Sequence, residues 1–438
     1  MSGYGGSLRY LLGLQSRGMK FGLENMRTLL AWAGNPEREF RSIHIAGTNG
    51  KGSTAAFVAS IMMEGRLRTG LYTSPHLVRF TERIRVDGRE IPRSCIPPYV
   101  RRLRPAVEAT GATFFEAVTC LAFMFFAEEG VEIAVVETGL GGRLDATNVI
   151  RPLACVITSV AVEHAEILGR TQAAIAREKA GILKRGIPCV SGLEPGMAAR
   201  VLERRARDVG APLGRAGALV VAEVVGSGGL LKRVRLKSRR FDIRCRLGLP
   251  GSYQTGNAHL AVALCEVLAR KGVVPFLRRP EATRVIARGL ARAGVNSGLE
   301  GRFMVLGTRP RVVLDVAHNP AAMRVLSSSL QEEGIMPAVT VFGAMRDKEA
   351  GRMLRILRPR GGVLVPVRPR NPRALPLSAL GVAARGAGFR TLPGSDVPRG
   401  VRRALGEAGN TGTVLVTGSH YVVGEALAWL RMRRTLTM

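Results

Sequence analysis

A glycine-rich loop between an apolar segment and a helical segment carries the strongest chemical signal in the sequence. It reads Ile43-His-Ile-Ala-Gly-Thr-Asn-Gly-Lys-Gly-Ser-Thr54 and runs into the helical pattern of Ala55–Met63. Glycines let backbone N–H groups turn toward phosphate oxygens, a lysine adds a positive charge, and the helix N-terminus adds its dipole. We therefore expect a nucleotide-phosphate site in which Ser53 also ligates Mg²⁺.

The spacing of this loop departs from the common pattern G-x-x-x-x-G-K-[ST]. Two residues separate Gly47 from Gly50, and Gly52 stands between Lys51 and Ser53. An ordinary glycine-rich turn before a helix is the alternative, but strand, loop, lysine, hydroxyl and helix coincide here. The residues expected to hold the phosphates are Gly47, Thr48, Asn49, Gly50, Lys51, Gly52 and Ser53.

Short apolar segments rich in β-branched residues recur between helical stretches and must position this loop. They are Ser42–Ala46, Ile133–Glu137, Cys155–Val160, Val312–Val316, Val339–Phe342, Gly362–Val367 and Thr413–Thr417. Strands that alternate with helical patterns predict βαβ units and largely parallel sheets. Ligands bind at the carboxyl ends of the strands in such sheets, so polar motifs directly after these segments are the candidates for chemistry.

The pattern changes in the middle of the chain. Residues 200–249 are Gly-rich and alternating, which predicts an antiparallel excursion without an obvious site. A helical stretch at 257–271, an Arg-rich segment at 277–295 and the turn Asn296-Ser-Gly follow, after which strand and helix alternate again.

A chain of 438 residues, 46% of them hydrophobic, is long enough for two cores or more. We place the domain boundary near Asn296. The predicted domains are residues 1–296, which hold the phosphate loop, and residues 297–438, a smaller α/β unit.

Targeting and redox signals favour the cytoplasm. The longest apolar stretch, Phe114–Phe126, contains Glu116 and is shorter than the roughly 20 residues of a membrane-spanning helix, so we expect a core helix. The N-terminus has only the short apolar run Tyr10–Leu12 and no secretory signal pattern. Six cysteines without C-x-x-C spacing predict buried reduced thiols.

The net charge of +32 is the unusual global feature, because a field of that sign concentrates polyanions of any kind. No RNA-binding or helix-turn-helix signature accompanies it, and few aromatic residues lie among the arginines. We therefore expect no specific nucleic-acid partner.

Further motifs follow the loop in a fixed order along almost the whole chain. They are Lys20-Phe-Gly-Leu-Glu-Asn25, Tyr72-Thr-Ser-Pro-His-Leu77, Glu82-Arg-Ile-Arg85, Glu137-Thr-Gly-Leu-Gly-Gly-Arg-Leu-Asp-Ala-Thr-Asn148, Arg177-Glu-Lys-Ala-Gly-Ile182, Gly301-Arg-Phe303, Asp315-Val-Ala-His-Asn-Pro320 and Arg346-Asp-Lys348. With these motifs the sequence resembles the folylpolyglutamate synthase and dihydrofolate synthase family of the Mur ligase superfamily. The resemblance implies an α/β fold: a Mur-ligase-like N-terminal phosphate-loop domain with a mostly parallel sheet, and a smaller C-terminal Rossmann-like domain.

The resemblance also implies a site for two Mg²⁺ ions. Glu137 ends one apolar strand and Ser74 another, so that a carboxylate and a hydroxyl would join Ser53 as hard oxygen ligands at the sheet edge. His164 matches the family's histidine at the second ion, although a surface or core histidine is the alternative. The family usually has Asp before this histidine, whereas Glu163 stands here, which leaves the role of that acid open.

Other positions match family contacts to ATP. Arg302, Asp315 and His318 would grip the nucleotide from the second domain, so that ATP binds between the domains. Asn257 matches a further ATP contact, with a helix cap as the alternative. Lys179 matches a lysine that is often carbamylated, with a helix-surface lysine as the alternative.

The pterin site that the resemblance implies consists of three segments with aromatic and apolar surface for a flat ring. Its residues are Phe21, Gly22, Leu23, Glu24, Thr113, Phe114, Phe115, Glu116, Leu144, Asp145 and Ala146. For Phe114 and Phe115, ordinary core packing is the alternative.

The implied activity is an ATP- and Mg²⁺-dependent ligase that adds L-glutamate to dihydropteroate, to tetrahydrofolate (poly)glutamates, or to both, through an acyl phosphate. A peptidoglycan Mur-type ligase is the alternative within the superfamily; residues 20–25 and 73–77 favour the folate branch. A phosphate-loop ATPase that acts on nucleic acid is the alternative from another class. The expected partners are small-molecule substrates, with no membrane contact, and the expected state is a cytoplasmic monomer.

Overall fold

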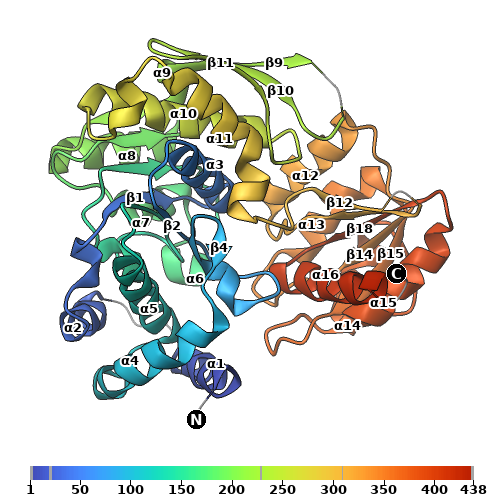
Figure 1. Cartoon of the computed structure of the whole chain (residues 1–438). Coiled ribbons are helices and arrows are strands. Elements are labelled where there is room, and N and C mark those ends of the chain that lie inside the picture. The colour runs from blue at the N-terminus through green and yellow to red at the C-terminus, as the bar shows by residue number, and fades with distance from the viewer. Residues whose placement is uncertain (1–2, 19–21, 227–228, 308, 436–438) are drawn as a thin grey trace.

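The computed structural model describes residues 3–18, 22–226, 229–307 and 309–435. Two sheets of mostly parallel strands, each with helices on both faces, lie side by side (Figure 1). We call the part with the first sheet the N-terminal half, drawn from blue to yellow, and the part with the second sheet the C-terminal half, drawn in orange and red. The predicted α/β class with mostly parallel sheets is therefore confirmed.

The first sheet has eight strands in the order β4-β3-β2-β5-β1-β6-β7-β8. Their bounds are Arg41–Ala46 (β1), Thr69–Tyr72 (β2), Ile84–Val86 (β3), Arg89–Glu90 (β4), Ile133–Glu137 (β5), Ala154–Ile157 (β6), Cys189–Ser191 (β7) and Leu213–Arg215 (β8). In this order, the strands β2, β5, β1, β6, β7 and β8 run parallel to one another. The pairs β2–β3 and β3–β4 at the edge of the sheet are antiparallel. Every residue of β5 is buried, because helices cover both faces of the sheet, and its sequence is therefore almost continuously apolar.

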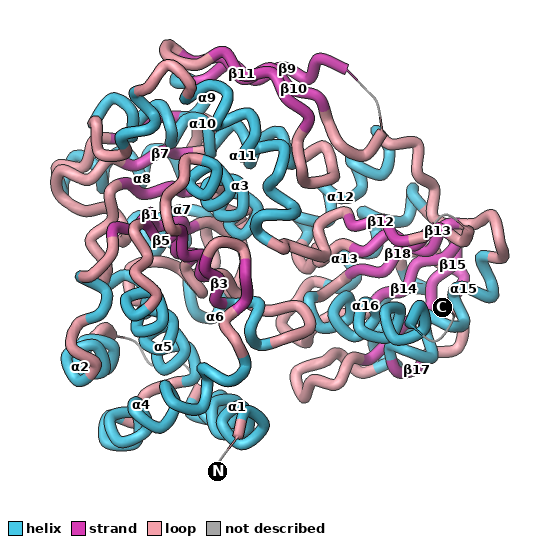
Figure 2. The backbone as a smooth tube through the Cα atoms, viewed as in Figure 1, coloured by secondary structure: helices cyan, strands magenta, loops and turns pink. Residues whose placement is uncertain are grey.

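Helices cover this sheet on both sides (Figure 2). On one face lie α3 (Lys51–Glu64), α10 (Gln254–Lys271) and α11 (Ala282–Ser297), which share a core with Ile43 and Ile45 of β1. On the other face lie α1 (Tyr4–Gly13), α2 (Glu24–Trp32), α4 (Ile96–Thr110), α5 (Phe114–Glu128), α7 (Gln172–Ala180) and α8 (Met197–Val209). The prediction that residues 114–126 form a core helix is confirmed by α5, most of which is buried.

A three-stranded antiparallel sheet packs on α10. It consists of β9 (Val220–Gly226), β10 (Arg233–Ser238) and β11 (Asp242–Arg246), which confirms the predicted excursion for this part of the chain. The prediction was wrong for residues 200–219. Leu213–Arg215 form β8, which pairs parallel with β7, Ala216–Leu219 form the short helix α9, and residues 200–209 belong to α8. There Ala198, Leu202 and Ala206 are buried at helical spacing and hold the helix against the core.

The second sheet has the order β12-β13-β18-β14-β15-β16, and all its strands except β12 run parallel. The bounds are Met304–Leu306 (β12), Arg311–Leu314 (β13), Val339–Phe342 (β14), Val363–Arg368 (β15), Arg390–Thr391 (β16) and Thr413–Thr417 (β18); Ser395–Asp396 (β17) pairs with β15. One face packs on α12 (Pro320–Glu332), α13 (Ala350–Leu357) and α14 (Leu377–Gly386), the other on α15 (Val397–Ala408) and α16 (His420–Thr435).

Between the two sheets, α11 ends at Ser297, two residues into the predicted turn Asn296-Ser-Gly, and Gly298 is its cap residue. Gly298 adopts a left-handed conformation with φ 59°, which suits glycine after a helix. Strand β12 then starts at Met304. The ranges 1–296 and 297–438 remain our predicted domains. Among the described helices, none combines the length and the apolar character needed to cross a membrane.

Candidate active site

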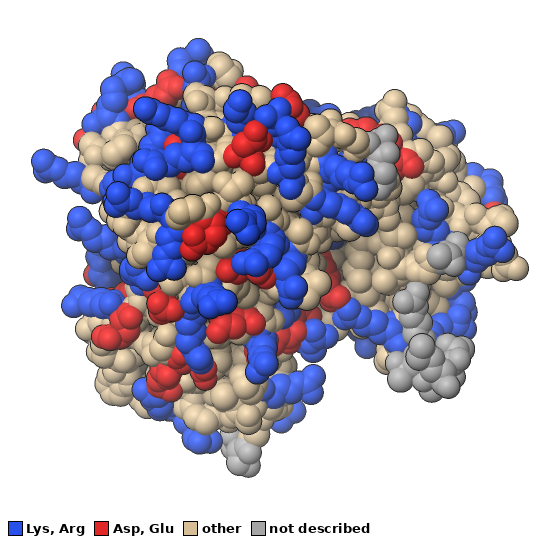
Figure 3. Space-filling model, turned by 45° about the horizontal axis from the view of Figure 1, so that its top comes forward, with Lys and Arg blue, Asp and Glu red and all other residues tan. Residues whose placement is uncertain are grey.

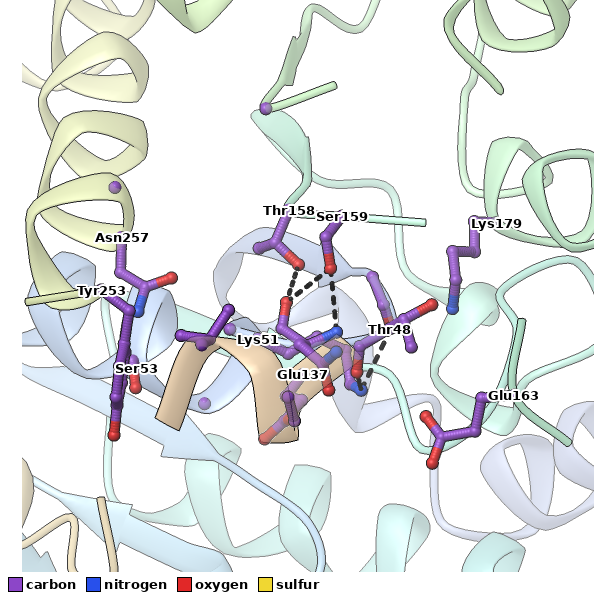
Figure 4. Close-up of a pocket in the computed structure, with 18 of the residues that line it drawn as sticks. Thr48, Lys51, Ser53, Glu137, Thr158, Ser159, Glu163, Lys179, Tyr253 and Asn257 are labelled. Atoms are coloured by element: carbon purple, nitrogen blue, oxygen red, sulfur yellow. Dashed lines mark hydrogen bonds between the residues drawn. The ribbon is translucent and has the colours of Figure 1, made fainter. Parts of the chain in front are cut away.

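A large cleft of about 860 Å³ lies between the two halves. The phosphate loop forms one wall, and residues after β13 and β18, among them Asp315 and His420, form the other. Figure 4 shows the loop and its neighbours. Every nucleotide and metal candidate predicted from the sequence lines this cleft: Gly47, Thr48, Asn49, Gly50, Lys51, Gly52, Ser53, Ser74, Glu137, His164, Lys179, Asn257, Arg302, Asp315 and His318.

The phosphate loop is held in one conformation by its neighbours. Lys51 Nζ donates to the carbonyl oxygens of Gly47 (3.1 Å) and Thr48 (3.2 Å), so its charge lies over the loop. Thr158 Oγ1 donates to Asn49 O at 2.7 Å. Gly47 has φ 155°, and a Cβ there would come within 1.9 Å of Thr158 Oγ1. Only glycine fits this close approach.

The N-terminus of α3 faces the cleft without a side-chain cap. Its cap position is Gly50, with φ 84°. The first N–H groups of a helix lack partners within the helix, and here no side chain supplies one. Together with the helix dipole, these N–H groups suit phosphate oxygens.

Oxygen donors gather beside the loop. Glu137 ends β5 and is 4% exposed, and its Oε2 accepts from the backbone N–H of Ser74 at 3.1 Å. The expected meeting of β2 and β5 thus occurs, but Ser74 lies two residues beyond β2 and uses its N–H rather than its hydroxyl. Burial raises the pKa of Glu137, while Lys51, the Ser74 N–H and Arg302 lower it.

These donors fit Mg²⁺. In the described ranges no three His, Cys, Asp or Glu side chains gather as a ready-made metal cage. Mg²⁺ is usually held by one or two carboxylates together with substrate phosphates and waters. Ser53, Ser74 and Glu137 offer such a set next to the phosphate loop.

Glu163 joins the two halves of the molecule. Its Oε1 accepts a hydrogen bond from Lys348 Nζ at 2.9 Å. The same oxygen lies 2.9 Å from His318 Nε2. Although burial opposes the effect, His318, Lys348 and His164 hold the pKa of Glu163 well below its usual range. This acid, whose role the sequence left open, therefore contacts the C-terminal half.

His164 lies next to the same cluster, in a left-handed conformation with φ 50° at the start of the short helix α6 (Ala165–Leu168). Its Nε2 is 3.4 Å from Lys348 Nζ, and its Nδ1 is 3.9 Å from Asp347 Oδ2. Burial and Lys348 lower the pKa of His164 to about 4, so the ring is neutral at pH 7 and keeps a lone pair for a metal.

Lys179 is not a helix-surface lysine. It is 3% exposed, and burial together with Lys51 lowers its pKa to about 7. In Figure 4 its side chain extends toward the side of the cleft where Glu163 lies. Its amine is therefore partly neutral near pH 7.

The C-terminal wall is anchored by Asp315, which is 5% exposed. Its Oδ2 accepts from the Tyr253 hydroxyl (2.8 Å) and the Phe303 N–H (2.9 Å), and its Oδ1 accepts from the Ala317 N–H (2.8 Å). This carboxylate therefore ties β13 to the start of α10 in the other half.

Asn257 lies inside α10, whose cap residue is Tyr253, so the alternative of a helix cap is wrong. Its Nδ2 donates to Gln254 Oε1 at 2.9 Å, and its Oδ1 would lie 2.5 Å from a Cβ on Gly50. Asn257 therefore contacts the phosphate loop directly.

The predicted pterin contacts lie away from this cleft: none of those in the described ranges lines it. Thr113 and Glu116 form the capping box of α5, and Asp145 accepts from the Thr147 N–H at 3.1 Å. Phe114 belongs to a core cluster and lies 5.3 Å below the Arg83 guanidinium. Phe21 falls outside the described residues. Pterin contact by these segments remains a prediction.

The sequence analysis missed several residues that line the cleft. Thr158 and Ser159 directly follow β6, and Ser419 and His420 follow β18, so the rule of looking after each strand would have found them. Arg215 lines the cleft as well, from the region we expected to contain no site.

Comparison with protein families gives two matches. The model described as the Mur ligase middle domain matches residues 45–189, and the one described as the Mur ligase, glutamate ligase domain, matches residues 301–420.

Named relatives fall into one group. The chain is 36% identical over 352 residues to the dihydrofolate synthase/folylpolyglutamate synthase of Bacillus subtilis, which covers 78% of the chain and 79% of that protein. It is 37% identical over 440 residues to a Haloferax volcanii protein named probable bifunctional folylpolyglutamate synthase/dihydropteroate synthase, covering 98% of the chain. The chain spans about half the length of that protein and of its Halobacterium salinarum counterpart.

Solved structures agree with these relatives. The structure of Escherichia coli FolC in complex with DHPP and ADP has a TM-score of 0.86 and 29% sequence identity, and the match covers 99% of both chains. A Yersinia pestis bifunctional folylpolyglutamate synthase/dihydrofolate synthase complexed with AMPPNP and Mn ion has a TM-score of 0.84 at 29% identity, covering 98% of both chains.

Proposed function

Because the chain belongs to the folylpolyglutamate synthase and dihydrofolate synthase family of Mur-type ligases, we propose that it joins L-glutamate to a pteroate or folate carboxylate with ATP. The proposed substrates are dihydropteroate and tetrahydrofolate (poly)glutamates. The observation that carries the proposal is a single cleft in which the phosphate loop faces Arg302, Asp315 and His318 of the other half.

The nucleotide would bind between the halves. The N–H groups of the loop and of the uncapped start of α3 would hold its phosphates, with Lys51 as the charge partner. Asn257 would contact it from α10, and Arg302, Asp315 and His318 from the C-terminal half. The relatives whose structures are complexes with ADP or AMPPNP support this assignment.

Ser53, Ser74 and Glu137 would hold one Mg²⁺ ion, and neutral His164 would hold a second. Bound there, Mg²⁺ would spread the charge of the transferring phosphoryl group. His164 can ligate only if it exchanges its contact with Lys348 Nζ for the ion.

Lys179 would carry a carbamate. The neutral amine attacks CO₂ and releases a proton, which gives a carbamate anion. Carbamylation would thus replace a side chain that is otherwise partly cationic by an anion. The lowered pKa of Lys179 supports this step, because a large share of its amine is neutral near pH 7.

The chemistry needs little acid or base from the protein. The free carboxylate of dihydropteroate, or of the glutamate chain of a folate, attacks the terminal phosphorus of ATP and gives an acyl phosphate and ADP. The amine of glutamate then attacks the acyl carbon and expels phosphate. Lys51 and Arg302 would stabilise the charge that develops on the phosphoryl oxygens, and the fold positions the reactants. We place this reaction in the cytoplasm and in a monomer.

The test is a product assay by mass spectrometry with ATP, Mg²⁺, glutamate and either dihydropteroate or tetrahydrofolate. We expect glutamylated products from both, together with ADP. Turnover of UDP-muramoyl substrates alone would instead indicate a peptidoglycan ligase. ATP hydrolysis that nucleic acid stimulates and glutamate does not affect would indicate a phosphate-loop ATPase.

A further inference from the structure

Two segments of the C-terminal half meet at the mouth of the cleft. Residues 345–348 pair with residues 368–374 through a bridge between Met345 and Ala374, and the Arg346 N–H donates to Arg373 O at 2.9 Å. Met345, Lys348 and Arg373 line the cleft itself. We call these two segments the basic ledge.

The basic ledge carries five cationic side chains and one carboxylate, Asp347. The cations are Arg346, Lys348, Arg368, Arg370 and Arg373. Lys348 is bound to Glu163, and Arg373 Nη2 lies 3.2 Å from Asp347 Oδ1 with 65% of its side chain exposed. In the part of the chain that the structure describes, no carboxylate forms an ion pair with Arg346, Arg368 or Arg370.

The loop that presents these arginines is held in place. Pro369 and Pro372 restrict its backbone, the Asn371 N–H donates to Pro369 O at 2.8 Å, and Asn371 Oδ1 accepts from the Arg373 N–H at 2.9 Å. The Arg370 N–H donates to Glu425 Oε1 at 2.6 Å, which ties the loop to α16. A preorganised loop loses little conformational entropy when a ligand binds.

We propose that the basic ledge binds the oligoglutamate chain of substrates that already carry glutamates. This inference rests on the proposed function. Each ligation consumes one carboxylate and brings in two, so the chain behind the reacting carboxylate gains one net negative charge. A growing chain of carboxylates needs a cationic surface next to the reaction centre. The fork of an arginine side chain fits a carboxylate with two parallel hydrogen bonds.

The location favours the ledge over the other basic surfaces of the molecule. Figure 3 shows Lys and Arg side chains over much of one face, including both sides of the indentation between the halves. Elsewhere in the molecule several arginines are paired, such as Arg288 and Arg292 with Glu64, and Arg235 with Asp242. In the ledge as the structure describes it, arginines without an ion pair lie next to Lys348 and Arg373, which line the cleft.

Equilibrium binding to the full chain tests the inference without ligation. The probes are fluorescent pteroyl ligands with one and with four glutamates, and the variants are Arg370→Gln, Arg373→Gln and the double variant. We expect the four-glutamate ligand to bind more tightly than the one-glutamate ligand. The double variant should reduce that preference about fivefold or more, as expected for two partly exposed charge pairs.

The matched control is the double variant Arg385→Gln/Arg399→Gln, which removes the same charge from the exposed surfaces of α14 and α15. If the control reduces the preference as much as Arg370→Gln/Arg373→Gln does, net charge explains the binding and the inference is overturned. Equal affinity of the wild-type chain for both ligands also overturns it. Failure of the wild-type chain to ligate glutamate, with the preference intact, would refute the proposed function alone.

Discussion

Glu163 Oε1 and Lys348 Nζ form a 2.9 Å ion pair that connects the two halves of the molecule across the cleft, and each side chain is only 8% exposed. The partners are 185 residues apart in sequence. A buried charge whose partner is removed is strongly destabilising, because nothing then compensates its desolvation. We therefore expect the pair to stabilise closure of the cleft beside His164 and His318.

Replacing Glu163 by Gln should weaken this closure. Lys348 and His318 would lose their anionic partner, so we expect kcat to fall by about tenfold or more while the chain stays folded. Glu163→Asp, which restores the charge on a shorter side chain, should recover part of the loss. Small-angle scattering with and without an ATP analogue measures the closure directly. Unchanged kinetics in Glu163→Gln would show that the pair is irrelevant to turnover.

The charge of Glu163 predicts a pH response. Because its pKa in the folded chain is lowered, the pair stabilises closure above the ordinary pKa of Glu, about 4.3, and this contribution is lost as the pH falls toward the lowered value. Thermal melting of wild type and Glu163→Gln between neutral and acidic pH should show a difference that shrinks only below about pH 4.3. A difference that already vanishes between pH 7 and 5 would contradict the assignment.

Lys51→Ala should abolish ligation and leave the fold intact. Among the described residues, its side chain forms hydrogen bonds only with carbonyl oxygens of its own loop, so we expect no core to depend on it. We expect a loss of at least about 10²-fold in kcat, typical of removing a charge that stabilises a phosphoryl transition state. Circular dichroism and melting temperature serve as the controls for folding. Near-normal turnover would place the phosphate site elsewhere.

Glu137→Gln should raise the Mg²⁺ concentration needed for half-maximal turnover by about tenfold or more, because an amide is a weaker ligand than a carboxylate. Glu223→Gln, on the exposed strand β9, provides a matched change outside the cleft. Titration of Mg²⁺ at saturating ATP measures the effect. Equal Mg²⁺ dependence of turnover in the two variants would show that Glu137 does not bind the metal ion.

Carbamylation of Lys179 should depend on pH and bicarbonate. Its amine is neutral above its pKa of about 7 and protonated below it, so the carbamate should build up as the pH rises through 7. Carbon-13 NMR with labelled bicarbonate detects the adduct, and Lys179→Ala should remove the signal and the activity. Partial rescue of Lys179→Ala by a small carboxylate such as acetate would support an anionic role. A signal that persists in Lys179→Ala belongs to another group.

Asp315→Ala should raise KM for ATP more than KM for glutamate, because nucleotide binding in the ground state is lost. Tyr253→Phe keeps the carboxylate and removes only one of its donors, so it should have the smaller effect. Initial rates at varied ATP and glutamate distinguish the two constants. If Asp315→Ala leaves the ATP kinetics unchanged, the nucleotide site lies within the N-terminal half.

Features that depend on neighbours along the chain could be predicted from the sequence. Gly47 and Gly50 adopt positive φ values between a strand and a helix, and their identity revealed the loop. The apolar strands β5, β14 and β18 have the predicted bounds, because parallel strands covered on both faces read as continuous apolar runs. The α/β class and the order of the motifs follow from the same local signals.

Which distant groups meet could not be predicted from the sequence, because burial and pairing depend on chain segments that no local pattern relates. Glu163 finds Lys348 and His318, and Asp315 finds Tyr253, only when the halves face each other. Lys179 reads as a surface helix residue in sequence, yet packing excludes water from its amine and shifts its pKa. The same packing opens the cleft at Arg215, where the sequence contains no sign of a site.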